Sequence, residues 1–141
     1  MRSLDPAHAP NYGLARACNL HEPFAFQQQC RTGATPHLLV WGDSFAMQLV
    51  DGVAASTSDT IAQATRAVCA PFLGIAPVDG GEHPLVWALW CEALNRSVIA
   101  ELAHAPQLRT VVLSSYPNMF PGQKPVGKSI MPTVARLARR I

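Results

Sequence analysis

Charged residues are scarce in this sequence, at 14% of 141 residues, and the net charge is only +2. The one cluster of basic residues, formed by Arg136, Arg139 and Arg140, has no aromatic residues interleaved with it. We interpret this cluster as the solvated face of a helix, so the sequence favours no nucleic-acid partner. Because 49% of the residues are hydrophobic, we expect a globular chain, one domain or part of one, with a core of its own.

Long apolar runs and closely paired cysteines are also missing. No stretch approaches the roughly 20 apolar residues that span a bilayer. The first residues, MRSLDPAHAPNYG, lack the apolar core of a signal peptide, so we expect any export signal to lie outside this chain. No cysteine lies in a Cys-x-x-Cys pair, which argues against zinc ribbons and thioredoxin-like sites. We expect no metal and no cofactor.

The sequence does contain four cysteines, Cys18, Cys30, Cys69 and Cys91. Three disulfide pairings are possible, and the pairs Cys18–Cys30 and Cys69–Cys91 close the shortest loops. The alternative is four buried thiols in a cytosolic protein. The first two cysteines lie in a segment rich in proline and polar residues with little core to hold it. This favours disulfides and an oxidising compartment.

The apolar pattern predicts strands that alternate with helices after an irregular, disulfide-bearing lead-in over residues 1–36. We expect strands over residues 37–42, 60–65 and 109–115. A helix should follow Ser44 and fade near residues 56–58, and two more helices should cover residues 85–104 and 129–141. This alternation predicts a parallel sheet with right-handed crossovers. The third strand has no evident partner and the sheet is small, so we expect a chain that is cut short.

The tripeptide Gly42-Asp43-Ser44 stands where the first strand meets its helix. A serine on such a turn lies at the carboxyl edge of the sheet, where open α/β proteins bind ligands. Its N–H lies at a helix N-terminus, which stabilises a developing oxyanion. Gly42 allows a tight turn, and Asp43 can accept backbone N–H groups and stiffen it. The alternative is that Ser44 only caps the helix. The tripeptide by itself favours capping, because it often occurs by chance, and its position at the end of the first strand brings the two interpretations into balance.

The segment VWGDSFAMQL resembles the first conserved block of the SGNH/GDSL hydrolases, in which this serine is the nucleophile. Further segments narrow the resemblance to the SGNH domain that is fused to family 3 membrane acyltransferases. These segments are ACN (17–19), CRTG (30–33), LLVWGDS (38–44), QATRAVCAPFLG (63–74), CEALN (91–95) and TVVLSS (110–115). The resemblance as a whole covers residues from about 12 to 141, and residues 37–141 resemble the N-terminal part of the domain.

The resemblance implies a flavodoxin-like three-layer α/β/α fold, with about three of its five parallel strands present here. It also implies a bacterial, periplasmic domain of an inner-membrane protein that acylates cell-surface carbohydrates such as lipopolysaccharide. An acylated donor and a carbohydrate acceptor would then react through an acyl-serine at Ser44. Further oxyanion donors in the family correspond by position to Gly74 and Asn118, although both residues could instead be ordinary turn residues.

Two features depart from the family pattern. Phe45 follows the serine, where this subgroup frequently has histidine. No Asp-x-x-His follows Ser44, although this block supplies the catalytic aspartate and histidine of the family. We interpret His83 as a loop residue and His104 as a partner of helix-terminal carbonyls. A serine without a base is a poor nucleophile, so we expect the isolated chain to be nearly inactive.

Four functions therefore remain open. The first is an O-acyltransferase or esterase that acts on a carbohydrate, and a plain secreted esterase would share its serine. A non-catalytic module that binds an acylated sugar, or a degenerate fragment, would suit the missing base. A phosphate-bearing cofactor at the sheet edge is disfavoured, because the GDSFAM segment offers only one hydroxyl.

Overall fold

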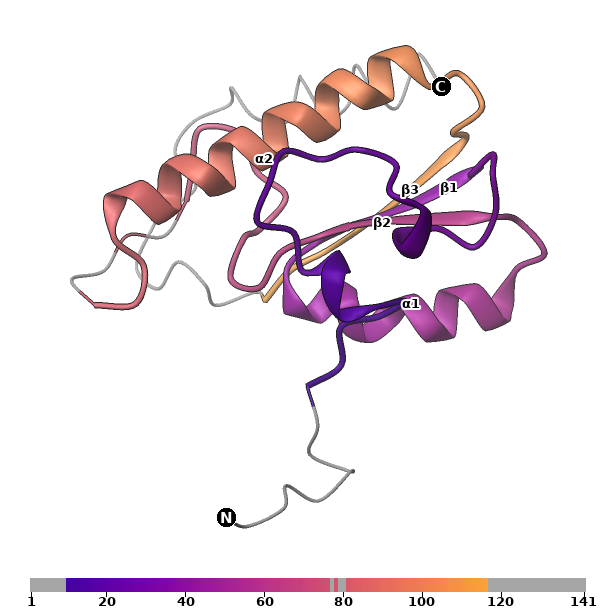
Figure 1. The fold of residues 1–141 in the computed structure, drawn as a ribbon, viewed down its shortest axis with the longest axis horizontal. Coiled ribbons are helices and arrows are strands. Elements are labelled where there is room, and N and C mark those ends of the chain that lie inside the picture. The colour runs from indigo at the N-terminus through magenta and orange to yellow at the C-terminus, as the bar shows by residue number, and fades with distance from the viewer. Residues whose placement is uncertain (1–9, 77, 79–80, 117–141) are drawn as a thin grey trace, which may run out of the picture.

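A computed structural model describes residues 10–76, 78 and 81–116 of the chain (Figure 1). The strands in this part are β1 (Leu38–Gly42), β2 (Ile61–Thr65) and β3 (Thr110–Ser114). The helices are α1 (Ser44–Ser56) and α2 (Leu85–His104), preceded by the short 3-10 helices η2 (Arg16–Cys18) and η3 (Gln28–Cys30). The helix predicted over residues 129–141 lies outside the described residues.

The three strands form one parallel sheet in the order β2-β1-β3. Gly42 at the end of β1 is in register with Thr65 of β2 and with Ser114 of β3. The carboxyl ends of all three strands therefore meet at one edge. Helix α1 covers one face of the sheet and α2 the other, as Figure 1 shows. The predicted parallel α/β fold is confirmed in the described part of the chain.

Two apolar clusters, one on each face of the sheet, form the core. Every residue of β1 and β2 is buried, which explains the continuous apolar run of β1. Leu39 and Trp41 point toward α2, where they pack with Leu94 and Val98. On the opposite face, Val40 belongs to the cluster that α1 completes. The side chains of β1 thus alternate between the two helical layers, as the pleat of a strand requires.

The lead-in is held more firmly than the sequence suggests. Leu20 and Phe24 are buried in the cluster on the α2 face, so the expectation of a segment with little core was wrong. The buried Gln63 amide of β2 accepts from the Leu14 N–H at 2.9 Å and donates to the Tyr12 carbonyl at 2.7 Å. These contacts link residues about fifty positions apart, so no local sequence pattern reveals them.

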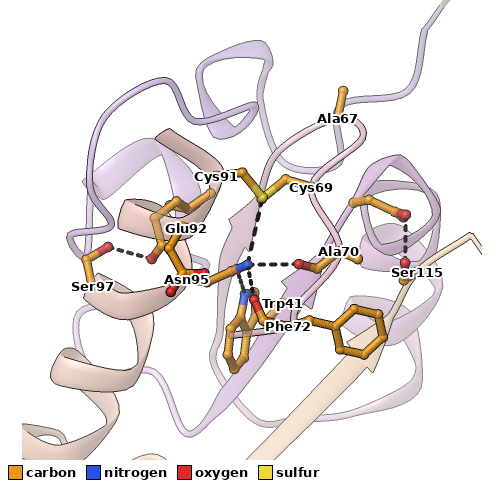
Figure 2. The surroundings of a disulfide bond; sticks show 12 residues. Trp41, Ala67, Cys69, Ala70, Phe72, Cys91, Glu92, Asn95, Ser97 and Ser115 are labelled. Atoms are coloured by element: carbon orange, nitrogen blue, oxygen red, sulfur yellow. Dashed lines mark hydrogen bonds between the residues drawn. A yellow bond between two sulfur atoms is a disulfide. The ribbon is translucent and has the colours of Figure 1, made fainter. Parts of the chain in front are cut away.

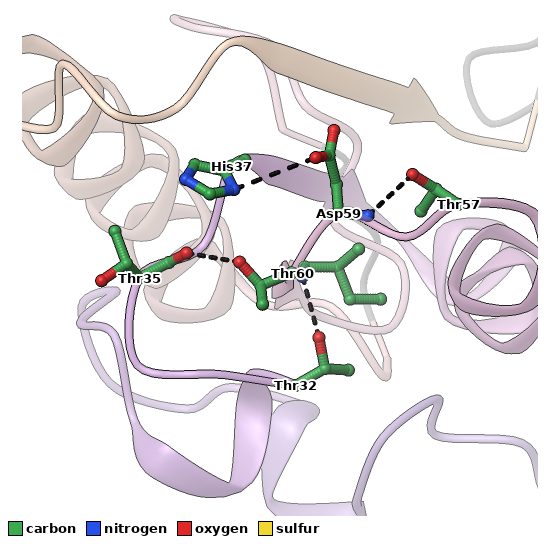
Figure 3. A network of polar contacts seen from close by, with 7 residues as sticks. Thr32, Thr35, His37, Thr57, Asp59 and Thr60 are labelled. Atoms are coloured by element: carbon green, nitrogen blue, oxygen red, sulfur yellow. Dashed lines mark hydrogen bonds and ion pairs between the residues drawn. The ribbon is translucent and has the colours of Figure 1, made fainter.

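A network of polar contacts joins the lead-in to the amino end of the sheet (Figure 3). The Thr60 hydroxyl donates to the Thr35 carbonyl, and the Thr32 hydroxyl accepts from the Ile61 N–H at 2.9 Å. Nearby, the His37 and Asp59 side chains approach to 3.9 Å. This network fixes the start of β2 and lies at the edge of the sheet opposite Ser44.

Candidate functional site

The carboxyl edge of the sheet is built around a close approach between Gly42 and β3. A Cβ atom at position 42 would lie 1.8 Å from the Ser114 carbonyl oxygen. The φ angle of Gly42, +154°, is also one that residues with side chains rarely adopt. The carbonyl of Gly42 accepts a hydrogen bond from the Arg66 N–H at 3.1 Å. Glycine at this position therefore lets the ends of all three strands come together.

Asp43 is fully buried and serves as the N-cap of α1. Its Oδ1 accepts from the Phe45 N–H at 2.8 Å, so it satisfies one of the free donors in the first turn of the helix. Its Oδ2 accepts from the Ser115 hydroxyl at 2.9 Å and from the Tyr116 N–H at 2.7 Å. One carboxylate thus joins the start of α1 to the end of β3. The turn-stiffening role predicted for Asp43 reaches further than the turn itself.

Ser44 is the first residue of α1 and is partly exposed at the carboxyl edge. Asp43, rather than Ser44, performs the N-cap function, so capping does not account for the serine. Among the described residues, no group hydrogen-bonds the Ser44 hydroxyl or the Ser44 N–H. Both groups remain open to a ligand, at a helix end that favours negative charge.

None of the described histidines bonds this hydroxyl. His37 lies at the amino end of the sheet. His104 Nδ1 lies 2.8 Å from the Ala100 carbonyl oxygen, which confirms its predicted role at the end of α2. His83 lies in the loop before α2, as predicted, and its ring packs edge-on against a tryptophan of that helix. His21 lies in the lead-in, and no described imidazole hydrogen-bonds the hydroxyl of Ser44.

The Asp-x-x-His spacing occurs once in the sequence, at Asp5-Pro6-Ala7-His8. This occurrence precedes the first strand, whereas the family block follows the last one. It also lies outside the described residues. The aspartate and histidine that the resemblance implies therefore have no counterpart in the described part of the chain.

The two predicted oxyanion donors other than Ser44 remain predictions. The Gly74 N–H donates to the Glu92 Oε2 at 2.7 Å, with Gly74 at a φ angle of +74°. Glu92 also pairs with Arg96 at 2.7 Å. The N–H of Gly74 is thus occupied by a carboxylate of α2 in this structure. Asn118 lies outside the described residues.

The long loop between β2 and α2 is fastened by a disulfide and a buried asparagine (Figure 2). Cys69 is bonded to Cys91, and Cys18 is bonded to Cys30. Of the three pairings that the sequence allows, the structure has the one with the shortest loops. Within the described residues no group of three or more histidine, cysteine or acidic side chains could hold a metal ion.

Asn95 of α2 lies beside the Cys69–Cys91 bond and uses both ends of its amide. Its Oδ1 accepts from the Trp41 Nε1 at 2.9 Å, and its Nδ2 donates to the carbonyls of Ala70 and Phe72, each at 2.8 Å. Figure 2 shows these bonds converging on one side chain. The loop at residues 70–72 is thereby tied to β1, which leads into the turn at Asp43 and Ser44.

Arg66 is a residue of this edge that the sequence reasoning missed. It follows β2 directly, and only 3% of its surface is exposed. Its guanidinium lies 5.4 Å from the ring centroid of Trp87 and 5.8 Å from that of Trp90. Burial lowers the pKa of Arg66 from its ordinary value. The spacing of two tryptophans one helical turn apart is a signal that could have suggested a cation beside α2.

The parallel sheet, with the Gly42-Asp43-Ser44 turn at its carboxyl edge, defines an open-sheet α/β protein. A family model described as the SGNH domain fused to AT3 domains matches residues 17–140. The chain belongs to this SGNH domain family, and the resemblance inferred from its spaced segments is confirmed. The fusion supports a membrane acyltransferase as the partner domain. No curated protein and no solved structure is significantly similar to the chain.

No helix in the described part of the chain is both long enough and apolar enough to cross a membrane.

The lead-in forms a cleft of about 520 Å³. Its walls include Tyr12, Arg16, Asn19 and His21. Asn19 Oδ1 accepts from the Ala67 N–H at 2.9 Å, so one wall of the cleft is joined to the chain just after β2.

Proposed function

We propose that Ser44 is the nucleophile of an acyl-transfer reaction in which a cell-surface carbohydrate hydroxyl receives the acyl group. The observation that carries the proposal is the open hydroxyl and open N–H of Ser44 at the carboxyl edge of an SGNH-family sheet. The capping role is taken by Asp43, so helix capping does not explain a serine at position 44.

In the proposed reaction, Ser44 Oγ attacks the carbonyl carbon of the acyl donor while a base takes the hydroxyl proton. The carbonyl oxygen becomes an oxyanion, which the Ser44 N–H stabilises together with the positive end of α1. The leaving group departs with a proton, and an acyl-serine remains. A carbohydrate hydroxyl then attacks the acyl-serine, loses its proton to the base and releases Ser44. Water in place of the sugar would give hydrolysis.

The proposed setting is the bacterial periplasm, beside the membrane domain that would deliver the acyl group. The fusion described for the family supports a membrane partner. The two disulfides support an oxidising compartment. The base is proposed to come from an Asp-x-x-His block that is not part of this sequence, so the isolated chain is expected to turn over slowly.

The test compares two serines on the same helix. The complete reading frame that contains these codons is expressed, and hydrolysis of p-nitrophenyl acetate is measured for the wild type, Ser44→Ala and Ser56→Ala. Ser56 ends α1 and its hydroxyl donates to the Val53 carbonyl, far from the carboxyl edge. Ser44→Ala should lower kcat/KM by at least about a thousandfold, whereas Ser56→Ala should leave it within about twofold. Equal activity of all three proteins would refute the nucleophile.

A second candidate is a non-catalytic module that binds an acylated sugar at the same edge. The absence of any histidine bonded to Ser44 among the described residues favours it. Such a module would bind acetylated methyl glycosides without consuming them, and Ser44→Ala would keep that binding. Trapping of an acetyl group on Ser44, detected by peptide mass spectrometry, would exclude it.

A further inference from the structure

Two aromatic rings flank the nucleophile turn and stack on each other. Phe45 directly follows Ser44 in the first turn of α1, and Tyr116 lies two residues beyond the end of β3. Their ring centroids are 5.2 Å apart with an interplanar angle of 29°. Large parts of both residues remain exposed, 41% of Phe45 and 44% of Tyr116. Apolar surface of this size beside a nucleophile needs an explanation.

The pair is built by a single buried carboxylate. Asp43 Oδ1 holds the Phe45 N–H at 2.8 Å, and Asp43 Oδ2 holds the Tyr116 N–H at 2.7 Å. The Ser115 hydroxyl adds a third bond to the same carboxylate. A carboxylate with no exposed surface is costly unless it is fully hydrogen-bonded, so these bonds fix both backbones firmly. The stacked rings are therefore a defined feature of the site, set one residue away from the reacting oxygen.

We propose that the Phe45–Tyr116 pair is the acceptor subsite, on which a pyranose ring rests while one of its hydroxyls attacks the acyl-serine. This inference rests on the proposed function and names the residues that would select its substrate class. A pyranose has a face of C–H groups that suits an aromatic surface and a rim of hydroxyls. The Tyr116 ring is apolar and suits the C–H face of the sugar, while its phenol hydroxyl can hydrogen-bond a sugar hydroxyl.

The openness of the pair favours a sugar over an acyl chain. A flexible acyl chain gains most when apolar walls enclose it on several sides. The side chains of Phe45 and Tyr116 instead have only two rotatable bonds each. Ordering them against one face of a sugar ring therefore costs little conformational entropy. The exposed fractions of Phe45 and Tyr116 leave ring surface next to Ser44 accessible to such a sugar.

The test measures how the acyl-serine partitions between a sugar and water. The full-length protein is given p-nitrophenyl acetate as donor and methyl α-D-glucopyranoside, galactopyranoside or mannopyranoside as acceptor. The ratio of acetylated glycoside to acetate is then quantified by mass spectrometry. Because this ratio is set after the acyl-serine has formed, it does not depend on how fast a variant is acylated.

The variants separate aromatic stacking from size and folding. Phe45→Leu and Tyr116→Leu should each lower the transfer-to-hydrolysis ratio by about three- to tenfold, the range of an aromatic stacking contact. Phe45→Tyr should keep the ratio within about twofold. Leu49→Ala is the matched control, because Leu49 is similarly exposed, at 45%, but lies one turn further along α1. It should leave the ratio unchanged.

The outcomes distinguish this inference from the proposed function. If Ser44-dependent hydrolysis is present but both leucine variants transfer as well as the wild type, the aromatic subsite is wrong and the nucleophile stands. If no Ser44-dependent hydrolysis is found, the proposed function is wrong. Saturation-transfer NMR with the same three glycosides then decides the inference alone. Loss of the signal in Phe45→Leu but not in Leu49→Ala supports it, and equal signals overturn it.

Discussion

Replacement of Asn95 by alanine should be among the most destabilising single changes on the α2 face. Asn95 has no exposed surface. Its amide accepts a hydrogen bond from the indole N–H of Trp41, which is 4% exposed, and donates one to the carbonyl of Ala70, which is 1% exposed. Each buried polar group left without a partner costs about 1–3 kcal/mol. We expect Asn95→Ala to lower the free energy of unfolding by about 4 kcal/mol, the middle of the range for two such groups.

The expected loss is to be measured by urea unfolding with both disulfides intact. Far-UV circular dichroism is the appropriate signal, because the matched variant Trp41→Phe also changes the fluorescence. That variant removes one indole N–H, and the double variant with Asn95→Ala tests whether the two side chains act together. If they do, the double variant should lose less than the sum of the single losses, by at least about 1 kcal/mol.

Two results would refute this reasoning. A loss below about 1 kcal/mol for Asn95→Ala would mean that water or a local shift replaces the amide at little cost. Strictly additive losses would mean that the Trp41–Asn95 bond, 2.9 Å long in the structure, carries no energy of its own.

Three further predictions concern the same edge of the sheet. Gly42→Ala should unfold at a melting temperature at least about 10 °C lower and lose Ser44-dependent hydrolysis, because its Cβ would overlap the Ser114 carbonyl; a near-wild-type melt contradicts the close approach. Cys91→Ser should lower the free energy of unfolding in urea by about 3 kcal/mol, the loop-closure value for a bridge of 22 residues. If the variant is still less stable by the same amount after wild type and variant are both reduced, the loss does not come from the bridge. Arg66→Lys should cost about 1 kcal/mol, because an ammonium stacks less well on the two tryptophans; no change in unfolding would show that the rings do not hold the guanidinium.

The regular elements near the site could be predicted from local sequence. The apolar run of β1 and the turn glycine give the position of Ser44, and the helix predicted over residues 85–104 has the observed bounds. These features depend on neighbours within one or two turns, and periodicity reports on such neighbours. The start of β2 was predicted one residue early, within the usual uncertainty of element ends.

The parts that could not be predicted depend on contacts between distant residues. Asp43 is 73 positions from Tyr116, and Trp41 is 54 positions from Asn95. From local sequence, an aspartate after a glycine is interpreted as a turn residue, because its partners just after β3 are distant in the chain. Arg66 likewise looks like an ordinary surface charge in the sequence, because the two tryptophans that contact it lie on the distant helix α2.

The bonds of Asn95 also imply an order of events during folding. The carbonyls of Ala70 and Phe72 are satisfied by a side chain of α2, so the loop reaches its final shape only after that helix has docked on the sheet. The Cys69 and Cys91 sulfurs belong to the same docked arrangement. We therefore expect oxidation of this pair to be a late step, after closure of the Cys18–Cys30 loop, which spans only 12 residues. Acid-quenched alkylation during refolding would record the order of the two bridges, and early closure of the longer loop would contradict it.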